Sequence, residues 1–212
     1  WLEGQARLAH ETRGSYRVLD VGCGGMPYRP FFAPYASEYV GVDIVDGPDV
    51  LVGPVESLPV PDASFDVVLC NQVLEHCDDP PSAVRELARV VAPGGRVLAS
   101  THGVQVYHPS PQDLWRWTHA GLERLFAANG GWHELRVEPG AGTAATVGML
   151  VAIYVELLTK RTPLAPLGRA AIGGLNAVAE ALDARAGRLR DPTVPGTVFA
   201  NFHVTAVAPP GR

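Results

Sequence analysis

The run from Val18 to Pro27, VLDVGCGGMP, holds the residues whose types and spacing most clearly indicate ligand chemistry. Its first four residues predict a short buried strand that carries one acid, Asp20, and Gly22 and Gly24 follow directly. Glycines at this point let the backbone turn tightly and come close to a ligand, because no side chain intervenes. The pattern is typical of a nucleotide-binding loop, and a glycine-rich turn without a ligand is the alternative.

The details of this loop discriminate between nucleotides. A dinucleotide fingerprint counted from Gly22 would end at Pro27, which has no N–H to donate and stiffens the loop. A carboxylate at Asp20 would repel a pyrophosphate but suits a ligand that carries an ammonium and a sulfonium. S-adenosylmethionine (SAM) is such a ligand. We therefore expect SAM, and a nucleotide-dependent oxidoreductase is the disfavoured alternative.

A second acid, Asp43, ends the next predicted strand, residues 39–43, and lies 23 positions after Asp20. Folds of this kind place a carboxylate for the ribose hydroxyls about 20 residues after the first loop. Asp43 is therefore predicted to bind the ribose, although an acid that ends a strand is also a common turn former.

Five ordered segments between about residues 17 and 101 resemble the motifs of class I SAM-dependent methyltransferases, of the methyltransferase type 11-like kind. They are the D-x-G-x-G loop, the strand that ends at Asp43, the F-D-x-V strand from Phe65, the L-E-H run at 74–76 and the R-V-x-x-P-G-G phrase at 89–95. The resemblance implies an enzyme that uses SAM and releases S-adenosylhomocysteine.

The resemblance also implies a role for individual residues. The amino-acid end of SAM would be held by Asp20, Gly22 and Gly24, the ribose by Asp43, the adenine by the turn at Val55 and Glu56, and the methyl group would lie beside Asn71 and Gln72. Two positions depart from the family, since Met26 replaces its last loop glycine and Pro54 replaces its adenine-facing acid. These departures keep open a non-catalytic SAM-binding or partner protein.

The expected fold is an α/β, Rossmann-like sheet of seven strands, mostly parallel, with helices on both faces and an antiparallel seventh strand. Apolar runs predict strands near residues 16–21, 39–43, 49–52, 65–70, 96–101, 133–138 and 197–207. About 55 residues separate the last two strands, far more than a hairpin loop needs. We therefore expect one domain, 1–212, with a helical insertion at about 141–195 before strand seven.

The insertion contains two helical patterns. Residues 144–160 are almost uniformly apolar but shorter than the roughly 20 residues of a bilayer span, and residues 164–185 are amphipathic. The pair could form a lid over an apolar acceptor, a homodimer interface through the 144–185 helices, or a membrane-surface contact. Because we find no basic membrane-facing side, the first two roles are favoured and membrane contact is not expected.

The acceptor should lie near the segment after the fifth strand. Its residues from His108 to Thr118 resemble a segment of a methyltransferase subgroup from small-molecule biosynthesis. The expected acceptor is a small metabolite with a hydroxyl group, and N-methylation is the alternative. Trp115 and Trp117 in this segment serve either as a lid or core plug or as a platform for the substrate.

A hydroxyl acceptor benefits from a base that removes its proton, and histidine has a suitable intrinsic pKa. His108 with Asp113 is our first candidate, His102 the second and His76 the third. No metal is expected, because the histidines are scattered and no ligand spacing is recognisable.

Composition narrows the class of partner. The chain has 17 Lys and Arg against 22 Asp and Glu, a formal charge of −5, and no basic block that predicts a nucleic-acid face. Its three cysteines have no C-x-x-C spacing, which fits reduced thiols in a cytoplasmic protein.

Overall fold

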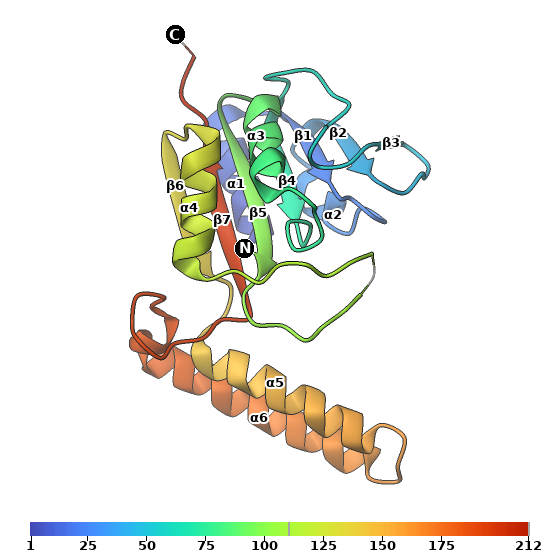
Figure 1. Ribbon diagram of the computed structural model, residues 1–212, viewed down its shortest axis with the longest axis vertical. Coiled ribbons are helices and arrows are strands. Elements are labelled where there is room, and N and C mark those ends of the chain that lie inside the picture. The colour runs from blue at the N-terminus through green and yellow to red at the C-terminus, as the bar shows by residue number, and fades with distance from the viewer. Residues whose placement is uncertain (110, 212) are drawn as a thin grey trace.

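The computed structural model describes residues 1–109 and 111–211 and is built on one seven-stranded sheet (Figure 1). The strand order is β3-β2-β1-β4-β5-β7-β6, and β7 alone runs antiparallel to its neighbours β5 and β6. The strands are β1 (Tyr16–Val21), β2 (Ala36–Asp43), β3 (Val50–Val52), β4 (Phe65–Asn71), β5 (Val91–His102), β6 (Glu134–Pro139) and β7 (Asn201–Val207).

Helices cover both faces of the sheet. On one face α1 (Leu2–Arg13) and α2 (Arg29–Phe32) pack over a cluster that includes Val18 and Leu69, and on the other α3 (Pro80–Val90) and α4 (His119–Gly130) pack over Leu19 and Val68. The alternation of Val18 and Leu19 between the clusters follows from the two-residue period of a strand. The predicted fold is therefore confirmed.

The central strands explain where a ligand can bind. β4 is apolar on both faces and lies between β1 and β5, as expected for a fully covered parallel strand. The chain order reverses beside β1, since β2 lies on one side of it and β4 on the other. Open α/β sheets bind ligands outside the carboxyl ends of the strands at such a switch point.

Two predicted strand limits are wrong for a physical reason. We expected Pro93 to Gly95 to precede the fifth strand, but β5 begins at Val91 because Gly94 and Gly95 pair with the end of the chain through Pro209 and Ala208. We expected the seventh strand to begin at 197, but β7 begins at Asn201. The backbone N–H groups of Val198 and Ala200 instead donate to the Thr143 and Thr146 hydroxyls.

The insertion before β7 consists of α5 (Thr143–Thr159), α6 (Ala165–Arg185) and the short 3-10 helix η1 (Gly187–Arg190). α5 and α6 form an antiparallel hairpin that extends away from the sheet (Figure 1). At its base the buried Asp183 carboxylate accepts hydrogen bonds from the Ala144 and Ala145 N–H groups, at 3.0 and 2.9 Å. The end of α6 thus caps the start of α5.

Candidate functional site

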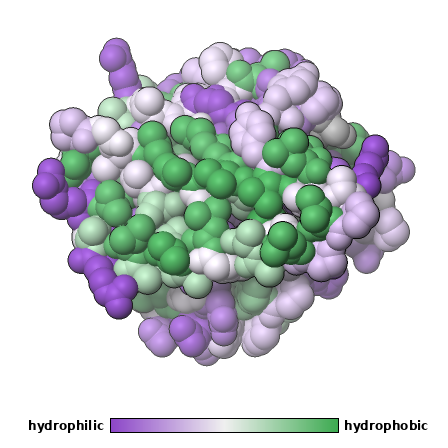
Figure 2. All heavy atoms as spheres, turned by 90° about the horizontal axis from the view of Figure 1, so that it is seen from below, coloured by the Kyte–Doolittle hydropathy of each residue, from purple (hydrophilic) through white to green (hydrophobic). Residues whose placement is uncertain are grey.

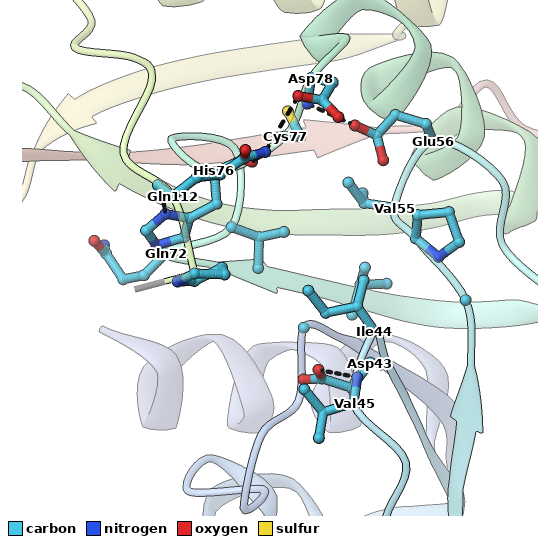
Figure 3. Close-up of a pocket in the computed structure, with 16 residues that line it drawn as sticks. Asp43, Ile44, Val45, Val55, Glu56, Gln72, His76, Cys77, Asp78 and Gln112 are labelled. Carbon is cyan, nitrogen blue, oxygen red and sulfur yellow. Dashed lines mark hydrogen bonds between the residues drawn. The ribbon is translucent and has the colours of Figure 1, made fainter. Parts of the chain in front are cut away.

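A cavity of about 650 Å³ lies at the carboxyl ends of β1 to β4 (Figure 3). Its size falls within the range of about 300–1,000 Å³ that is usual for ligand sites. Segments that follow four different strands and the loop after β5 contribute its walls, which are lined by Val21, Gly22, Asp43, Ile44, Val45, Gly53, Pro54, Val55, Glu56, Gln72, Val73, His76, Cys77, Asp78, Pro111 and Gln112.

Gly22 forms the floor where β1 meets β4. Its φ of +66° is a left-handed conformation, and a Cβ built on it would lie 2.3 Å from the Val73 Cγ2 atom. The N–H groups of Gly22 and Cys23 both donate to the Val42 carbonyl, at 2.8 and 3.1 Å, which turns the chain at the end of the strand. Glycine is required here by both conformation and space.

Asp43 lies at the end of β2 in the cavity wall, and its carboxylate is held by two backbone groups. The N–H of Gly24 donates to Oδ2 at 2.8 Å and the N–H of Val45 donates to Oδ1 at 3.0 Å. Each carboxylate oxygen can accept a further hydrogen bond from a ligand. The two loops after β1 and β2 are therefore joined through Asp43.

The opposite wall carries more acids. Glu56 lines the cavity beside Val55, and its Oε1 accepts from the N–H groups of Asp78 and Asp79, at 2.9 and 3.3 Å. Together with Asp43 and Asp78 it gives the cavity three carboxylates. Such a lining attracts a cationic ligand.

Gln72 follows β4 and has an unusual backbone, with φ of +57°. Its side-chain Nε2 donates to the Ser100 hydroxyl at 3.0 Å, while its Oε1 is buried with no hydrogen-bond partner among the described residues. Strained backbone and an unpaired acceptor both occur at ligand sites. Asn71 is buried behind it, accepts from Ser100, and does not line the cavity.

Two other predicted cofactor residues also lie outside the cavity. Asp20 is 1% exposed on the opposite face of the sheet, where the Tyr39 hydroxyl donates to its carboxylate at 2.6 Å. Burial raises the pKa of Asp20 to about 6. Gly24 lines a separate hollow with Met26 and Arg29. Met26 itself has φ of +54°, so it adopts a left-handed backbone where the resemblance expects a glycine.

Of the three histidines that we considered as a base, only His76 lines the cavity. Its Nδ1 donates to the Gln112 carbonyl oxygen, which requires the proton to be on Nδ1. The neutral ring therefore keeps an unprotonated Nε2. His108 packs edge-on against His76, with ring centroids 5.1 Å apart.

His102 and His108 form a pair behind this histidine. Their Nε2 atoms are 2.8 Å apart, and His102 Nε2 lies 3.4 Å from Oε1 of the fully buried Glu75. Burial, followed by the nearby His108 charge, lowers the pKa of His102 to about 4, so its ring is neutral at pH 7. Burial raises the pKa of Glu75, whose other oxygen accepts from the Thr101 hydroxyl at 2.9 Å.

Asp113 does not contact the His108 ring. Its carboxylate accepts from the His108 backbone N–H at 3.0 Å and from the Arg116 guanidinium at 2.7 Å. The Arg116 hydrogen bonds hold the pKa of Asp113 well below its usual range. Asp113 therefore shapes the loop that carries His108.

Trp115 and Trp117 connect the loop after β5 to the segment after β4. The Trp115 indole N–H donates to the Cys77 carbonyl at 2.9 Å, and Trp117 stacks on it and packs against the main core. The Gln112 side chain donates to the His76 carbonyl at 2.7 Å. The contacts of Trp115 and Trp117 favour a role as a core plug over a role as a platform for the substrate.

Several lining residues were not predicted from the sequence. Ile44 directly follows Asp43, and its apolar side chain is 58% exposed at the cavity wall. The sequence gives one indication of this role, because Ile44 is an apolar residue directly after the acid that ends the strand. Asp78 and Gln112 had no comparable signal, because the β4 exit and the loop after β5 meet only in the folded chain. Among the described residues, no three His, Cys, Asp or Glu side chains are grouped to hold a metal ion.

Comparison with known proteins identifies the family. Residues 19–99 match the family model described as a methyltransferase domain. The chain is 37% identical over 108 residues to an uncharacterized methyltransferase, YcgJ, of Bacillus subtilis, covering 43% of each chain. It is 34% identical over 120 residues to a ubiquinone biosynthesis O-methyltransferase of Pseudomonas paraeruginosa, covering 48% of each. The matched region is thus less than half of these relatives' length.

Solved structures extend the likeness of fold to nearly the whole chain. The crystal structure of YcgJ gives a TM-score of 0.56 at 22% identity and covers 99% of this chain and 98% of that one. The [4+2]-cyclase SpnF gives a TM-score of 0.60 at 20% identity, covering 99% and 81%. The methyltransferase-domain match over residues 19–99 and the strand order of the sheet therefore both support a class I SAM-dependent methyltransferase.

Proposed function

We propose that the protein transfers a methyl group from SAM to a hydroxyl group of a small-molecule acceptor. One observation carries the proposal: a single cavity brings together Gly22 and Asp43 of the cofactor motifs and His76, whose Nδ1 is hydrogen-bonded to the Gln112 carbonyl oxygen. The fold alone would not support it, since a neighbour with the same fold is a cyclase.

The cavity fits SAM in shape and charge. Asp43 would accept hydrogen bonds from the ribose hydroxyls, and Ile44 and Val55 would contact the adenine from the apolar part of the wall. Glu56 would hold the adenine turn in place through the backbone of Asp78. When bound, SAM supplies an electrophilic methyl group on a sulfonium, whose positive charge the three carboxylates favour.

The remaining cofactor residues act around the cavity. Gln72 lines the cavity and would contact the amino-acid end of SAM, and Asn71 would orient Gln72 through their shared partner Ser100. Gly24 would act through its hydrogen bond to Asp43, and Asp20 through Tyr39 at the base of the loop.

The geometry makes His76 the first candidate for the base, ahead of His108 and His102. Its Nε2 can accept the hydroxyl proton as the acceptor oxygen bonds to the methyl group, while the Gln112 carbonyl keeps the ring oriented. His108 would support this ring by packing edge-on against it, and His102 would hold His108 through their Nε2 contact.

The names of the relatives support the acceptor class. They include ubiquinone biosynthesis O-methyltransferases, which favours an oxygen over a nitrogen acceptor and a biosynthetic role. The three cysteines are buried free thiols, and we place the reaction in the cytoplasm on that basis.

Calorimetric titration with SAM and S-adenosylhomocysteine tests the cofactor site. We expect micromolar binding of both ligands, weakened at least about tenfold in Asp43→Ala because a charge-assisted hydrogen bond is lost. Asp46→Ala is the matched control, since this exposed acid lies on the same loop but does not line the cavity. A wild-type protein that binds neither ligand would indicate a non-catalytic partner protein instead.

Release of S-adenosylhomocysteine with a panel of phenols, aliphatic alcohols and amines tests the reaction. We expect turnover with a hydroxyl acceptor, reduced about 100-fold or more in His76→Ala with SAM affinity unchanged. Turnover confined to amines would replace the proposal with N-methylation, and an unimpaired His76→Ala enzyme would remove the base.

A further inference from the structure

The α5–α6 hairpin presents one continuous apolar face to solvent. On α5, Val147, Val151, Tyr154 and Leu158 recur at intervals of three and four residues, and all are exposed, Leu158 to 77%. This interval places side chains on one side of a helix. On α6 and the turn before it, the exposed apolar side chains are Leu164, Leu167, Val178 and Leu182.

The two stripes lie on the same face of the hairpin, which is directed away from the sheet. Viewed from below, apolar side chains form one broad patch bordered by polar groups (Figure 2). The opposite side of the hairpin carries exposed polar residues at helical spacing: Glu156 and Lys160 on α5, and Arg169, Asn176 and Glu180 on α6. None of the residues that line the cavity belongs to the hairpin, so the apolar face forms no part of the cavity wall.

The hairpin has little contact with the rest of the protein. α5 and α6 pack against each other and η1, and the base is joined to the segment before β7 through the Thr143 and Thr146 hydroxyls, which accept from the Val198 and Ala200 N–H groups. Close contacts at Gly148 and Gly168 hold the two helices together. The apolar face therefore projects as a separate surface, and uncovered apolar patches of this kind mark interaction sites.

The charge of the hairpin is opposite to that of the remaining chain. Residues 143–191 contain six Lys or Arg and four Asp or Glu, a formal charge of +2. The other residues contain 11 and 18, a charge of −7, which together give the −5 of the whole chain. Most of the hairpin's cations lie at its two ends, with Lys160 and Arg161 at the tip and Arg185, Arg188 and Arg190 at the base.

This charge distribution decides between two occupants of the apolar face. A two-fold dimer that lays the two hairpins along one another sets either tip against tip or tip against base, and both arrangements bring cations next to cations. An anionic surface attracts both ends at once. Cations that we could not locate from the sequence pattern are therefore present at both ends of the hairpin, with Lys160 on the side opposite to the apolar face.

We propose that the hairpin docks the protein on the surface of a bilayer that contains anionic phospholipids. The apolar stripes enter the boundary between headgroups and acyl chains, and the exposed Arg161 at the tip and Arg185, Arg188 and Arg190 at the base contact lipid phosphates. Among the described residues no helix is long and apolar enough to cross a membrane, so the hairpin lies along the surface. This docking does not depend on the reaction proposed above.

Co-sedimentation of the full chain with vesicles tests the proposal. One vesicle preparation is pure phosphatidylcholine and the other contains about 30% phosphatidylglycerol, a fraction at which surface charge is substantial. We expect the protein to sediment with the anionic vesicles, to bind the neutral ones at least about tenfold more weakly, and to be released by added salt.

Two matched variants separate the apolar face from the rest of α6. Leu167→Glu/Val178→Glu places two acids on the face, and Gly173→Glu/Asn176→Glu places the same two charges on exposed positions of the same helix, on the side of Arg169 and Glu180. We expect at least about a tenfold loss of vesicle binding in the first variant and a smaller loss in the second. Circular dichroism checks that both fold.

Three results would contradict the docking proposal or part of it, and they can be told apart. Equal loss in both variants would show that charge alone governs binding and would overturn the role of the face. A wild-type protein that binds neither vesicle would overturn docking altogether. If light scattering then shows a dimer that Leu167→Glu/Val178→Glu dissociates, the face pairs with a second copy of the chain.

Discussion

At the scale of single residues, Gly22 and Gly24 share a left-handed backbone but have different surroundings. A Cβ at Gly22 would meet the Val73 side chain at 2.3 Å, whereas nothing lies within 4 Å of one at Gly24. We expect Gly24→Ala to lower the free energy of unfolding by about 1 kcal/mol through backbone strain alone.

Gly22→Ala should cost about 1–3 kcal/mol more, because the same strain is joined by an overpacked contact. Urea denaturation of the two variants provides the comparison. Equal losses of stability would show that Val73 moves aside without cost, and the close approach at the cavity floor would lose its importance.

Asp20 predicts a pH dependence of folding. Its pKa is raised to about 6 in the folded protein from an ordinary value of 3.8, with burial as the main cause. The folded state therefore binds more protons than the unfolded state between these values, and Asp20 lowers stability as the pH rises from about 4 to about 6. The effect amounts to about 3 kcal/mol.

Asp20→Asn keeps a partner for the Tyr39 hydroxyl but removes the titration. Relative to this variant, the wild type should lose stability between pH 4 and pH 7 when urea unfolding is measured at each pH. A difference between the two proteins that stays constant with pH would contradict the raised pKa.

At the scale of elements, one buried acid connects the two helices of the hairpin. Asp183 is 4% exposed and satisfies two N–H groups at the start of α5. Asp183→Ala should reduce stability by about 1–3 kcal/mol, because both donors lose their partner. Hydrogen exchange should become faster in residues 143–159 while β1 and β4 stay protected.

Asp191→Ala is the control for this prediction. Asp191 is exposed near the same base and accepts only from the neighbouring Thr193. If this control accelerated exchange in α5 as much as Asp183→Ala does, the cap would not be the cause.

At the scale of the whole molecule, the fold could be predicted because its signals are local. The strands from Val18 and Phe65 are continuous apolar runs, and Gly22 and Asp43 directly follow strands. Parallel topology then brings these strand ends to one edge. The histidines could not be ranked, because their order depends on which carbonyl or ring each one contacts across the loop after β5.

The dependence on contacts made only in the folded chain also explains why Asp20 does not line the cavity and Asp113 does not contact the His108 ring. Asp20 alternates with Leu19 and Val21, so its side chain lies on the face opposite to the cavity. Sequence proximity placed Asp113 beside the His108 ring, but the Arg116 side chain turns its carboxylate toward the backbone. Side-chain direction is decided by tertiary partners that spacing does not reveal.

The ends of the insertion lie next to each other in the sheet. Pro139 of β6 pairs with Phe202 of β7, and the Gly140 N–H donates to the Asn201 carbonyl at 3.0 Å. Replacing residues 142–196 with a short glycine linker should therefore leave the sheet folded and SAM affinity within about threefold, because β6 and β7 are joined directly as a hairpin. Calorimetry measures the SAM affinity and circular dichroism the folding of the shortened chain. A shortened chain that fails to fold would show that α5 and α6 stabilise the sheet.

This arrangement has a consequence for how such proteins diversify. A segment whose two ends already meet can be gained, lost or exchanged between related genes without moving the residues that line the cavity. On the docking and the function proposed above, mutations in the hairpin change where in the cell the protein acts, and mutations at the strand ends change the reaction. Selection can adjust these two properties independently.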